Sequence, residues 1–507
     1  MRGETLVGHV PVVVIGAGFA GVCAAVVLTR AGRDVLVLER GASVGGVWRD
    51  NAYPGCACDV ESPLYSYSFA PNPTWSHVYA PQPEILAYMQ DVVRDAGLAD
   101  RIRCGVEVRR ADWDDDALTW RVETDHGTVT ADVLVSACGG LSEPSVPQLP
   151  GLAAFTAAGG AVVHSARWTP DLDVTGRRVA VVGSGASAIQ LVPQLAPRAA
   201  ELTVLQRTAP WIIPRRDREI PAARRARFAR RPATLRLVRW ALYAFRELLV
   251  LGMVHRPGLM RGVESLCRAH LRRQVPDPGL RALLTPTYRA GCKRILSSDD
   301  YYPALNRENV ELVPSGLAGF EPGAVVAADG TRREADVVVL ATGFETTDPP
   351  IAHHLRGRGG QLLADVWREG GMQALRGTTV HGFPNLFLLV GPNTGQGHTS
   401  MVQIIESQVA YVRDALTTME RRGVAALEPL AEAQTAWNDR LAARLRGTVW
   451  TTGGCSSWYQ DGHGRVTTLW PGSTVRLRRA TRRVDLAEYR VTPPRAALAP
   501  AAPGASR

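Results

Sequence analysis

Two glycine-rich turns in matching surroundings occur on one chain of 507 residues, and they limit its fold more than any other feature. The first reads Gly16-Ala17-Gly18-Phe19-Ala20-Gly21, and the second reads Gly183-Ser184-Gly185-Ala186-Ser187-Ala188. Each turn follows a short apolar strand and opens an apolar helix, the setting in which backbone N–H groups can approach a pyrophosphate. The sequence therefore predicts an α/β fold with two Rossmann-like dinucleotide-binding domains and a helical insert.

Two dinucleotides on one polypeptide most often exchange a hydride, from a nicotinamide to a flavin. The first unit's second strand ends in Glu39, at the spacing where a carboxylate can bind a ribose 2′-hydroxyl. The corresponding strand of the second unit ends in Arg207, and a cation there suits a 2′-phosphate. We therefore expect FAD in the first unit and NADPH in the second. The alternative is that Glu39 and Arg207 are ordinary charged residues at strand ends and bind no nucleotide.

Composition shifts and turn residues divide the chain further. The expected units are 1–150, the N-terminal part of the FAD-binding domain; 155–215, the first part of the NADPH-binding domain; 216–284, the helical insert; 285–335, the second part of the NADPH-binding domain; 336–480, the C-terminal part of the FAD-binding domain with a mobile loop; and 481–507, a disordered tail. In that loop, Trp470 either closes over NADP⁺ or substrate or is a buried anchor.

The bulk composition is that of an ordinary soluble globular protein, with 46% hydrophobic and 21% charged residues. No apolar run reaches the length of about 18 residues that a membrane span needs. The polar start of the chain leaves no room for a signal peptide. Eight scattered cysteines form no CxxC pair and show no metal-ligand spacing, so we expect a reduced cytoplasmic protein without a metal site.

Positive charge is concentrated in the insert, where residues 215–273 hold sixteen arginines and four acids, a net +12 against +10 for the whole chain. The apolar residues at helical spacing are Leu235, Val238, Leu242, Phe245 and Leu249. We expect this stripe to pack on the nucleotide domain. A surface for lipid or an anionic partner, including an anionic or carrier-bound substrate, is the alternative. No nucleic acid is expected as a partner.

Further segments between Val10 and Thr474 together resemble the Baeyer–Villiger type of flavoprotein monooxygenase. Gly45-Gly46-Val47-Trp48 and residues 53–62 are similar to that family's loop over the flavin. Gln206-Arg207-Thr208-Ala209-Pro210 resembles its site for the 2′-phosphate of NADPH, and Gly291-Cys292-Lys293-Arg294 resembles its catalytic-arginine segment. The motifs that resemble its late flavin-domain segments are Ala341-Thr342-Gly343-Phe344 and Gly391-Pro392-Asn393-Thr394-Gly395.

The resemblance implies an FAD- and NADPH-dependent monooxygenase that uses a flavin peroxide at C4a to insert one oxygen atom of O2 next to a ketone carbonyl. The product is an ester or lactone, and the substrate is expected to be a lipophilic ketone. Arg294 is the implied catalytic cation, paired with Asp59, because a fixed guanidinium stabilises developing negative charge. Lys293 and Arg207 are implied to hold the 2′-phosphate, and His164 is implied to position the two domains.

The glycine turns and the resemblance together give one set of expected cofactor-binding residues. They are Gly16, Gly18, Phe19, Ala20, Gly21, Glu39, Arg40, Gly46, Val47, Trp48, Asp59, Tyr65, Gly183, Ser184, Gly185, Ala186, Ser187, Arg207, Thr208, Lys293, Ala341, Thr342, Gly343, Asn393 and Thr394.

The chain departs from the family pattern around His164, including Thr169 between Trp168 and Pro170, and before the Cys58-Asp59 pair. Phe155 lies farther ahead of His164 than the family pattern has it, and Ala57 stands where the family often has arginine before the Cys-Asp pair. The N- and S-oxidising flavin monooxygenases share many of the other motifs. The alternatives are therefore an oxygenase of amines or sulfides, an NADPH oxidase or reductase without oxygen insertion, and a binding protein on a degenerate fold.

Overall fold

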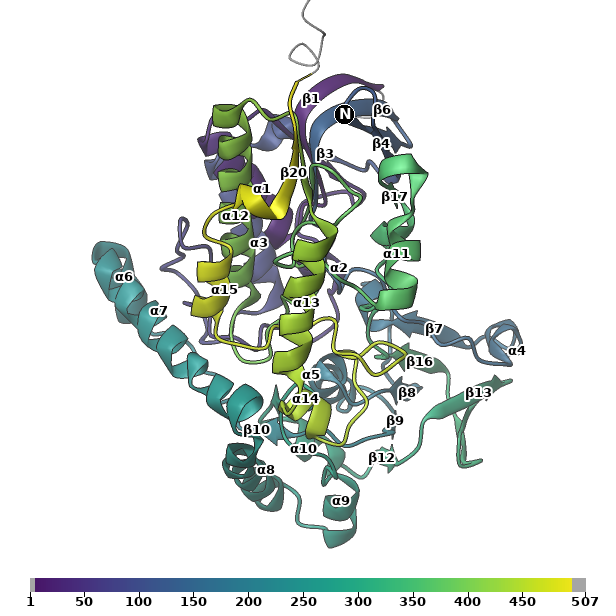
Figure 1. Ribbon diagram of the computed structural model, residues 1–507. Coiled ribbons are helices and arrows are strands. Elements are labelled where there is room, and N and C mark those ends of the chain that lie inside the picture. Colours follow the sequence, from purple (N-terminus) through teal and green to yellow (C-terminus); the bar gives the residue numbers. More distant parts are fainter. Residues whose placement is uncertain (1–4, 495–507) are drawn as a thin grey trace, which may run out of the picture.

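The computed structural model describes residues 5–494 and contains two main sheets, the first mixed and the second parallel (Figure 1). One glycine turn follows a strand of each sheet. The first sheet has eight strands in the order β17-β4-β5-β6-β1-β2-β3, with β18 also paired to β6. Its strands are β1 (Leu6–Ile15), β2 (Val35–Glu39), β3 (Ile102–Cys104), β4 (Val108–Asp114), β5 (Thr119–Thr124), β6 (Gly127–Ser136), β17 (Leu355–Arg356) and β18 (Leu386–Leu388).

The second sheet has five parallel strands in the order β12-β9-β8-β16-β7. They are β12 (Val310–Val313), β9 (Glu201–Leu205), β8 (Arg178–Val182), β16 (Val337–Leu340) and β7 (Ala161–His164). The two sheets agree with the expected fold class, in which each glycine turn serves its own Rossmann-like sheet.

One expected boundary is wrong, because the strand Val337–Leu340 does not belong to the first sheet. We expected residues 336–480 to complete the FAD-binding unit, yet β16 pairs with β8 and β7 of the second sheet. A run of four buried apolar residues fits any central parallel strand. The sequence pattern therefore identifies the strand but not the sheet that contains it.

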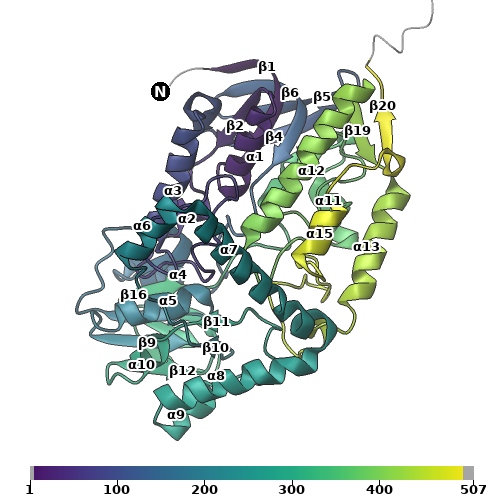
Figure 2. The ribbon, with the colours of Figure 1, turned by 90° about the vertical axis from the view of Figure 1, so that its left-hand side faces the viewer.

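Helices cover both sheets, as Figure 2 shows for α1 and α12 beside the first sheet. The helices of this half are α1 (Phe19–Arg30), α2 (Val47–Asp50), α3 (Gln82–Asp95), α11 (Leu363–Gly370), α12 (Met401–Arg422), α13 (Ala431–Leu445), α14 (Val449–Thr452) and α15 (Thr474–Ala480). Beside the second sheet lie α4 (Leu152–Ala157), α5 (Ala186–Leu195) and α10 (Tyr301–Leu305). Smaller sheets pair β10 (Ile212–Ile213) with β11 (Leu296–Ser297), and β13 (Leu317–Glu321) with β14 (Ala324–Ala327) and β15 (Arg332–Glu334).

Four α-helices lie in the predicted insert, namely α6 (Ala222–Arg230), α7 (Pro232–Glu247), α8 (Met260–Gln274) and α9 (Pro278–Leu283). The expected apolar stripe on α7 faces inward only in part. Leu235 is buried, whereas Phe245 keeps 67% of its surface exposed. Around Met253 and Met260, the insert forms a hydrophobic cluster with the later residues Val449, Trp450 and Tyr459.

The expected disorder of residues 481–507 is wrong for the part that the structure describes. Strand β20 (Tyr489–Thr492) pairs antiparallel with β19 (Ala426–Pro429). Tyr489 is buried, and its hydroxyl lies 2.6 Å from the hydroxyl of Tyr411. The arginine-rich composition hid this single anchoring aromatic residue. Residues 495–507 lie outside the described residues.

Across residues 5–494, the longest and most apolar helices still fall short of what a bilayer crossing requires. In the same range, no cluster of histidine, cysteine, aspartate and glutamate side chains is arranged to hold a metal ion.

The chain passes between the two sheets at two neighbouring segments, residues 143–145 and 343–345. The backbone N–H of Ser145 donates to the carbonyl of Gly343 over 2.9 Å, and that of Glu345 donates to the carbonyl of Glu143 over 3.0 Å. The ring of His164 packs edge-on against Phe344 at 5.9 Å between centroids. This packing places His164 at the crossing, in agreement with a positioning role.

Candidate functional site

The first glycine turn leaves no room for side chains. Gly16 has a φ of +100°, a conformation that favours glycine. A Cβ on Gly21 would lie 1.8 Å from the carbonyl oxygen of Gly16, and one on Gly46 would lie 2.9 Å from the Cα of Gly18. The turn and residues 45–46 therefore approach each other at the N-terminus of α1, where backbone N–H groups are unpaired and attract an anion.

Glu39 lies at the base of this turn, at the end of β2, with 5% of its surface exposed. Its carboxylate accepts hydrogen bonds from the backbone N–H of Ala17 at 2.8 Å and of Gly41 at 2.7 Å, and from Arg49 at 2.8 Å. Arg40 turns toward Glu143, 2.9 Å away. The structure thus brings Glu39 to the turn, while Arg40 lies beside the crossing between the sheets.

Aromatic side chains gather next to the first turn. The Trp48 indole N–H donates to the Tyr65 hydroxyl over 3.0 Å. The Tyr65 ring lies 5.2 Å from that of Phe19, the residue that begins α1. Three of the expected flavin contacts from separate segments are therefore neighbours.

The second turn is also close to the backbone on one side and open on the other. Gly183 has a φ of +123°, and a Cβ there would lie 2.4 Å from the carbonyl oxygen of Ala341. Gly185 begins α5, and a Cβ at this position would meet nothing within 4 Å. The Ser184 hydroxyl donates to the carbonyl of Thr208 over 2.7 Å. This bond fixes the turn beside the strand end that carries Arg207.

Lys293, the single lysine of the chain, lies close enough to Arg207 for the two charges to interact. Burial, and then the charge of Arg207, lower the pKa of the Lys293 ammonium below its ordinary value. Its Nζ also lies 5.2 Å from the centre of the Tyr288 ring. Two neighbouring cations without a shared carboxylate are suited to a dianionic group such as a phosphate.

Asp59 and Arg294 form a two-pronged ion pair across 235 residues of sequence. The Arg294 Nε donates to one carboxylate oxygen over 2.7 Å and a terminal nitrogen donates to the other over 2.8 Å. About 30% of each side chain remains exposed. Burial alone would raise the pKa of Asp59, but the charge and hydrogen bonds of Arg294 outweigh it and lower that pKa. Asp59 in turn raises the pKa of Arg294.

The lowered pKa of Asp59 has a consequence for stability at acid pH. Because Asp59 is harder to protonate in the folded chain, the pair stabilises the fold above the ordinary pKa of 3.8 and is lost as pH falls through the lower, folded-state value. We expect Asp59→Asn to lower the melting temperature by a constant amount between about pH 5 and 8, and by less below about pH 4. Thermal melts of both proteins measure this; a gap that widens on acidification would contradict it.

Sequence reasoning missed several residues around this pair. Arg246 on α7 donates to the backbone carbonyl of Asp59 over 3.2 Å, and Arg215 donates to that of Cys58 over 3.0 Å. Tyr459 is buried and interacts electrostatically with both members of the pair; burial raises its pKa to about 12. Its phenol therefore stays protonated at neutral pH. These residues had no sequence signal beyond their type.

The segment that carries Asp59 also contacts the second domain. The Tyr53 hydroxyl donates to the side-chain carbonyl of Gln190 on α5 over 2.9 Å. The amide group of Gln190 donates back to the carbonyl of Ala57 over 3.0 Å. A Cβ on Gly55 would lie 2.8 Å from the Gln190 backbone oxygen, so glycine permits this close approach. One loop therefore joins the two cradles.

The motif at residues 391–395 forms side-chain hydrogen bonds that fix its own backbone and that of residues 466–469. The Asn393 amide donates to the carbonyls of Val466 and Leu469 over 2.9 and 3.0 Å, and the Thr394 hydroxyl donates to that of Gly391 over 2.6 Å. Trp470, 1% exposed, stacks on Trp437 at 6.1 Å. Of the two alternatives for Trp470, the structure shows the buried anchor.

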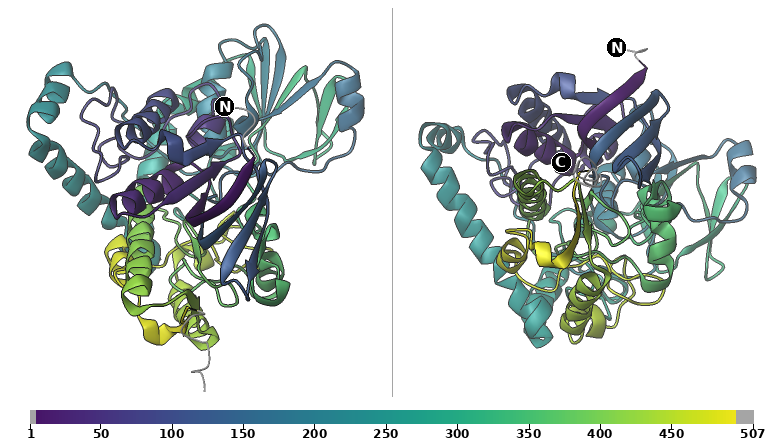
Figure 3. Two further views of the ribbon diagram at one scale, coloured as in Figure 1. Left: turned by 90° about the horizontal axis from the view of Figure 1, so that it is seen from above. Right: turned by 45° about the horizontal axis from the view of Figure 1, so that its top comes forward.

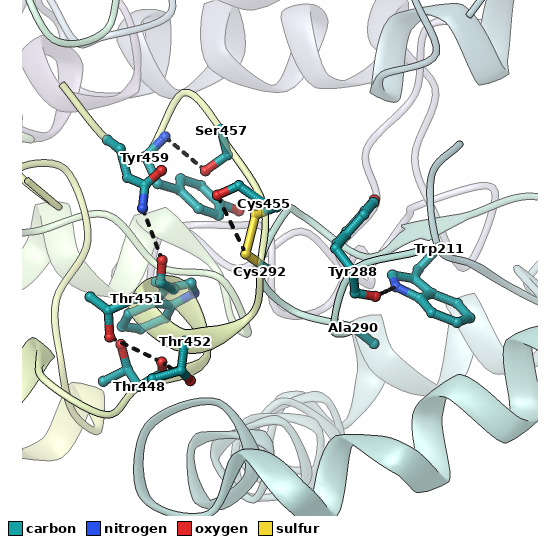
Figure 4. The surroundings of a disulfide bond; sticks show 12 residues. Trp211, Tyr288, Ala290, Cys292, Thr448, Thr451, Thr452, Cys455, Ser457 and Tyr459 are labelled. Atoms are coloured by element: carbon teal, nitrogen blue, oxygen red, sulfur yellow. Dashed lines mark hydrogen bonds between the residues drawn. A yellow bond between two sulfur atoms is a disulfide. The ribbon is translucent and has the colours of Figure 1, made fainter. Parts of the chain in front are cut away.

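The structure contradicts the expectation that all cysteines are reduced. Cys292 and Cys455 form a disulfide, shown in Figure 4, between the segment that carries Lys293 and Arg294 and the loop that carries Tyr459. The other six cysteines are free. No local spacing signals this bond, because 163 residues separate its partners and only the fold brings them together.

The disulfide gives a direct prediction. Denatured, unreduced protein should react with a thiol reagent at six cysteines, and reduced protein at eight. Cys455→Ser should lower the free energy of unfolding by about 2–5 kcal/mol, because the enclosed loop is long. Cys104→Ser, at an exposed free cysteine, is the control and should change it little. Eight reactive thiols before reduction would contradict the bond.

Comparison with known proteins agrees with this geometry. Residues 13–230 match the family model described as pyridine nucleotide-disulphide oxidoreductase. The chain is 52% identical over 499 residues to a Baeyer–Villiger monooxygenase of Streptomyces coelicolor, covering 98% of this chain and 95% of the relative. It is 45% identical to a Baeyer–Villiger monooxygenase of Pseudomonas aeruginosa, covering 96% and 92%.

Solved structures show the same architecture. An oxidised steroid monooxygenase bound to NADP superposes with a TM-score of 0.84 at 34% identity, covering 95% of this chain and 99% of the other. A closed cyclohexanone monooxygenase superposes with a TM-score of 0.85 at 28% identity, covering 96% and 100%. The chain therefore belongs to the type I Baeyer–Villiger monooxygenase family, whose members are flavoenzymes that use FAD and NADPH.

Proposed function

We propose that this Baeyer–Villiger monooxygenase acts on a lipophilic ketone, and that Arg294, held by Asp59, is its catalytic cation. The observation that carries the proposal is the two-pronged pair at 2.7 and 2.8 Å, which fixes a permanently charged guanidinium beside the aromatic cluster of the first cradle. A cation that needs no reorganisation during the reaction stabilises charge as it develops.

The two glycine turns fit the two cofactors. Side chains at Gly16, Gly21 and Gly46 would fill the space at the first helix N-terminus, and glycine keeps it open for a pyrophosphate. At the second turn, a Cβ on Gly185 would meet nothing within 4 Å, and the neighbouring Ser184 is bonded to the carbonyl of Thr208, next to Arg207 in the chain. FAD would be held at the first and NADPH at the second. Bound NADPH supplies a hydride, and bound reduced flavin supplies the activation of O2.

The residues of the chain then have defined tasks. Arg294 stabilises negative charge that develops on the carbonyl oxygen of the ketone during attack, and Asp59 keeps its guanidinium plane in one orientation. Trp48, Tyr65 and Tyr459 exclude water, because each is buried or half-buried against its neighbours. Exclusion of water protects reactive species from hydrolysis.

An apolar substrate is supported by the surroundings of Arg294. Besides the charged side chains of Asp59, Arg215 and Arg246, the groups near it include the phenol rings of Tyr65 and Tyr459, whose pKa values are raised by burial so that both are neutral at ordinary pH. Related solved structures are a steroid monooxygenase and a cyclohexanone monooxygenase, the first named for a class of largely apolar molecules and the second for an apolar ketone.

Product analysis tests the proposal. The purified holoenzyme is given NADPH, ¹⁸O2 and two matched panels, one of cyclic and linear ketones and one of sulfides and amines. We expect esters and lactones carrying one ¹⁸O atom, formed fastest from the larger apolar ketones. Sulfoxides or N-oxides without any ester would overturn the proposal in favour of heteroatom oxidation. NADPH consumption without a labelled product from either panel would show that the protein is an NADPH oxidase that inserts no oxygen.

The proposed phosphate site gives its own prediction. Lys293→Ala should raise the KM for NADPH by about 10- to 100-fold, the loss expected for one charge-assisted hydrogen bond, and change the KM for NADH little. Steady-state kinetics with both nucleotides measure the ratio. Arg218→Ala, which removes an exposed arginine from the insert, is the control. An unchanged preference for NADPH in Lys293→Ala would contradict the assignment.

We also propose a cytoplasmic location, because the enzyme draws on NADPH. In a reducing compartment the Cys292–Cys455 pair would be under continuous exposure to thiols. Fractionation of cells that produce the enzyme tests the location. Recovery from the periplasm or medium would overturn it.

A further inference from the structure

The inner face of helix α7 is hydrogen-bonded to residues 59–66, the segment that carries Asp59. Arg239 donates to the backbone carbonyls of Pro63 and Ser66, over 3.1 and 2.7 Å. Two helical turns further along, Arg246 donates to Glu61 over 2.6 Å and to the backbone carbonyl of Asp59 over 3.2 Å. The orientation of the helix about its own axis is therefore fixed by its polar inner contacts.

The opposite face of α7 is apolar and exposed. Its large side chains, 52–67% exposed, are Leu237, Trp240, Phe245, Leu248 and Leu251 just beyond the helix end. Successive spacings of three, eight and three residues place Leu237, Trp240, Leu248 and Leu251 on one side of the helix. Ala233, Ala241 and Ala244 lie between them on the same side. A soluble monomer rarely exposes so many large apolar side chains in one stripe.

Unpaired cations flank this face. The exposed arginines of α6 and the start of α7 are Arg224, Arg227, Arg230, Arg231 and Arg236. In the part of the chain that the structure describes, none of these five has a carboxylate within 4.0 Å, although ion pairs are common elsewhere. Figure 2, seen from this side, shows α6 and α7 running across the front of the molecule with no other element over them. In Figure 3 they form an arm at the edge of the body.

We propose that α6 and the outer face of α7 bind the surface of an anionic lipid bilayer. An apolar stripe with large aromatic and leucine side chains, bordered by arginines, is the pattern of a helix that lies in the plane of a membrane interface. The arginines attract anionic headgroups, and Trp240 with the leucines enters the acyl boundary. This inference goes beyond the proposed reaction and does not depend on it.

A second copy of the chain fits this surface less well. In a symmetric dimer the same patch meets itself, which would place the exposed arginines of α6 and the start of α7 against their own copies. Such like-charge contact opposes association, whereas an anionic bilayer complements the charge. The lipid surface is therefore the occupant that the charges favour.

Vesicle binding tests the inference with the flavin-loaded enzyme. It is sedimented with vesicles of phosphatidylcholine alone and of phosphatidylcholine with about one third phosphatidylglycerol. We expect binding only to the anionic vesicles, weakened by salt. Trp240→Ser with Leu248→Ser should weaken binding at least about tenfold. Arg227→Ala, Arg230→Ala and Arg231→Ala together should weaken it about a hundredfold, since each arginine near an anionic surface contributes a factor of about five.

Matched controls distinguish vesicle binding by this surface from nonspecific electrostatic or hydrophobic adsorption. Arg421→Ala, Arg422→Ala and Arg482→Ala remove three exposed arginines elsewhere, and Leu152→Ser removes an exposed leucine on α4. Both controls should bind as the wild type does. Brominated lipids should quench tryptophan fluorescence in the wild type and quench it less in Trp240→Phe.

Each contrary result overturns the inference. No sedimentation with anionic vesicles would exclude a membrane site. Equal losses of vesicle binding in the control variants would show that the enzyme adsorbs to anionic lipid nonspecifically. A dimer in solution that Trp240→Ser with Leu248→Ser converts to a monomer would show that a second chain covers the face.

Discussion

Replacing Arg294 by alanine should lower the rate of ester formation by about 100- to 1000-fold, the usual effect of removing one preorganised electrostatic group. The flavin should still bind and still be reduced by NADPH, because the glycine turns and the Lys293–Arg207 site are separate from the guanidinium. We therefore expect continued NADPH consumption without ester. Stopped-flow reduction of the flavin and product analysis by mass spectrometry measure the two steps independently.

Two further variants show whether charge or geometry matters at this position. Arg294→Lys keeps a cation but cannot form both bonds to Asp59, so it should recover only part of the rate. Arg333→Ala breaks another two-pronged pair, with Glu311 on the surface, and should leave the rate unchanged. If Arg294→Ala formed ester at the wild-type rate, Arg294 would not be the catalytic cation.

Gly21→Ala should yield protein without bound flavin and with a lower melting temperature. Alanine is normally the better helix former by about 1 kcal/mol, so helix propensity alone predicts a gain in stability. The new Cβ, however, would lie 1.8 Å from the Gly16 carbonyl oxygen, and Gly16 itself is held by its φ of +100°. The turn must therefore move, and the pyrophosphate site moves with it. The absorbance of the flavin in purified protein measures the outcome.

Gly185→Ala is the matched control, since it adds the same methyl group at the other turn. Gly185 has a φ of −80° and a Cβ there would meet nothing within 4 Å, so the fold and the flavin should be retained. The methyl group would still narrow the approach of the nucleotide, and the KM for NADPH should rise. Full flavin content in Gly21→Ala would contradict the tight contact seen at the first turn.

Local patterns were enough to predict much of the site. The two turns, the apolar strands before them and the acid Glu39 are all recorded within short stretches of sequence. The pair of Asp59 with Arg294 came from the resemblance of two distant motifs to one family, and the structure brings the two side chains together. Lys293 was singled out because it is the single lysine, and it does lie near Arg207.

Other features depend on the tertiary structure and had no local signal. The sheet to which Val337–Leu340 belongs is decided by strand order, because the same apolar run could occupy either sheet. The two faces of α7 were also mixed in the predicted stripe, which combined buried Leu235 with exposed Phe245. Hydrophobicity alone does not distinguish a face that packs from one that stays exposed, whereas the inward arginines Arg239 and Arg246 do.

The two neighbouring crossings at 143–145 and 343–345 join the halves of the enzyme along one short line. The two segments run antiparallel, with Pro144 opposite Phe344, and their hydrogen bonds oppose sliding and separation. The Cys292–Cys455 bond adds a covalent tether away from the chain crossings, between the segment that carries Lys293 and Arg294 and the C-terminal loop that carries Tyr459. With this bond reduced, the two crossing segments are the remaining covalent connections between the halves.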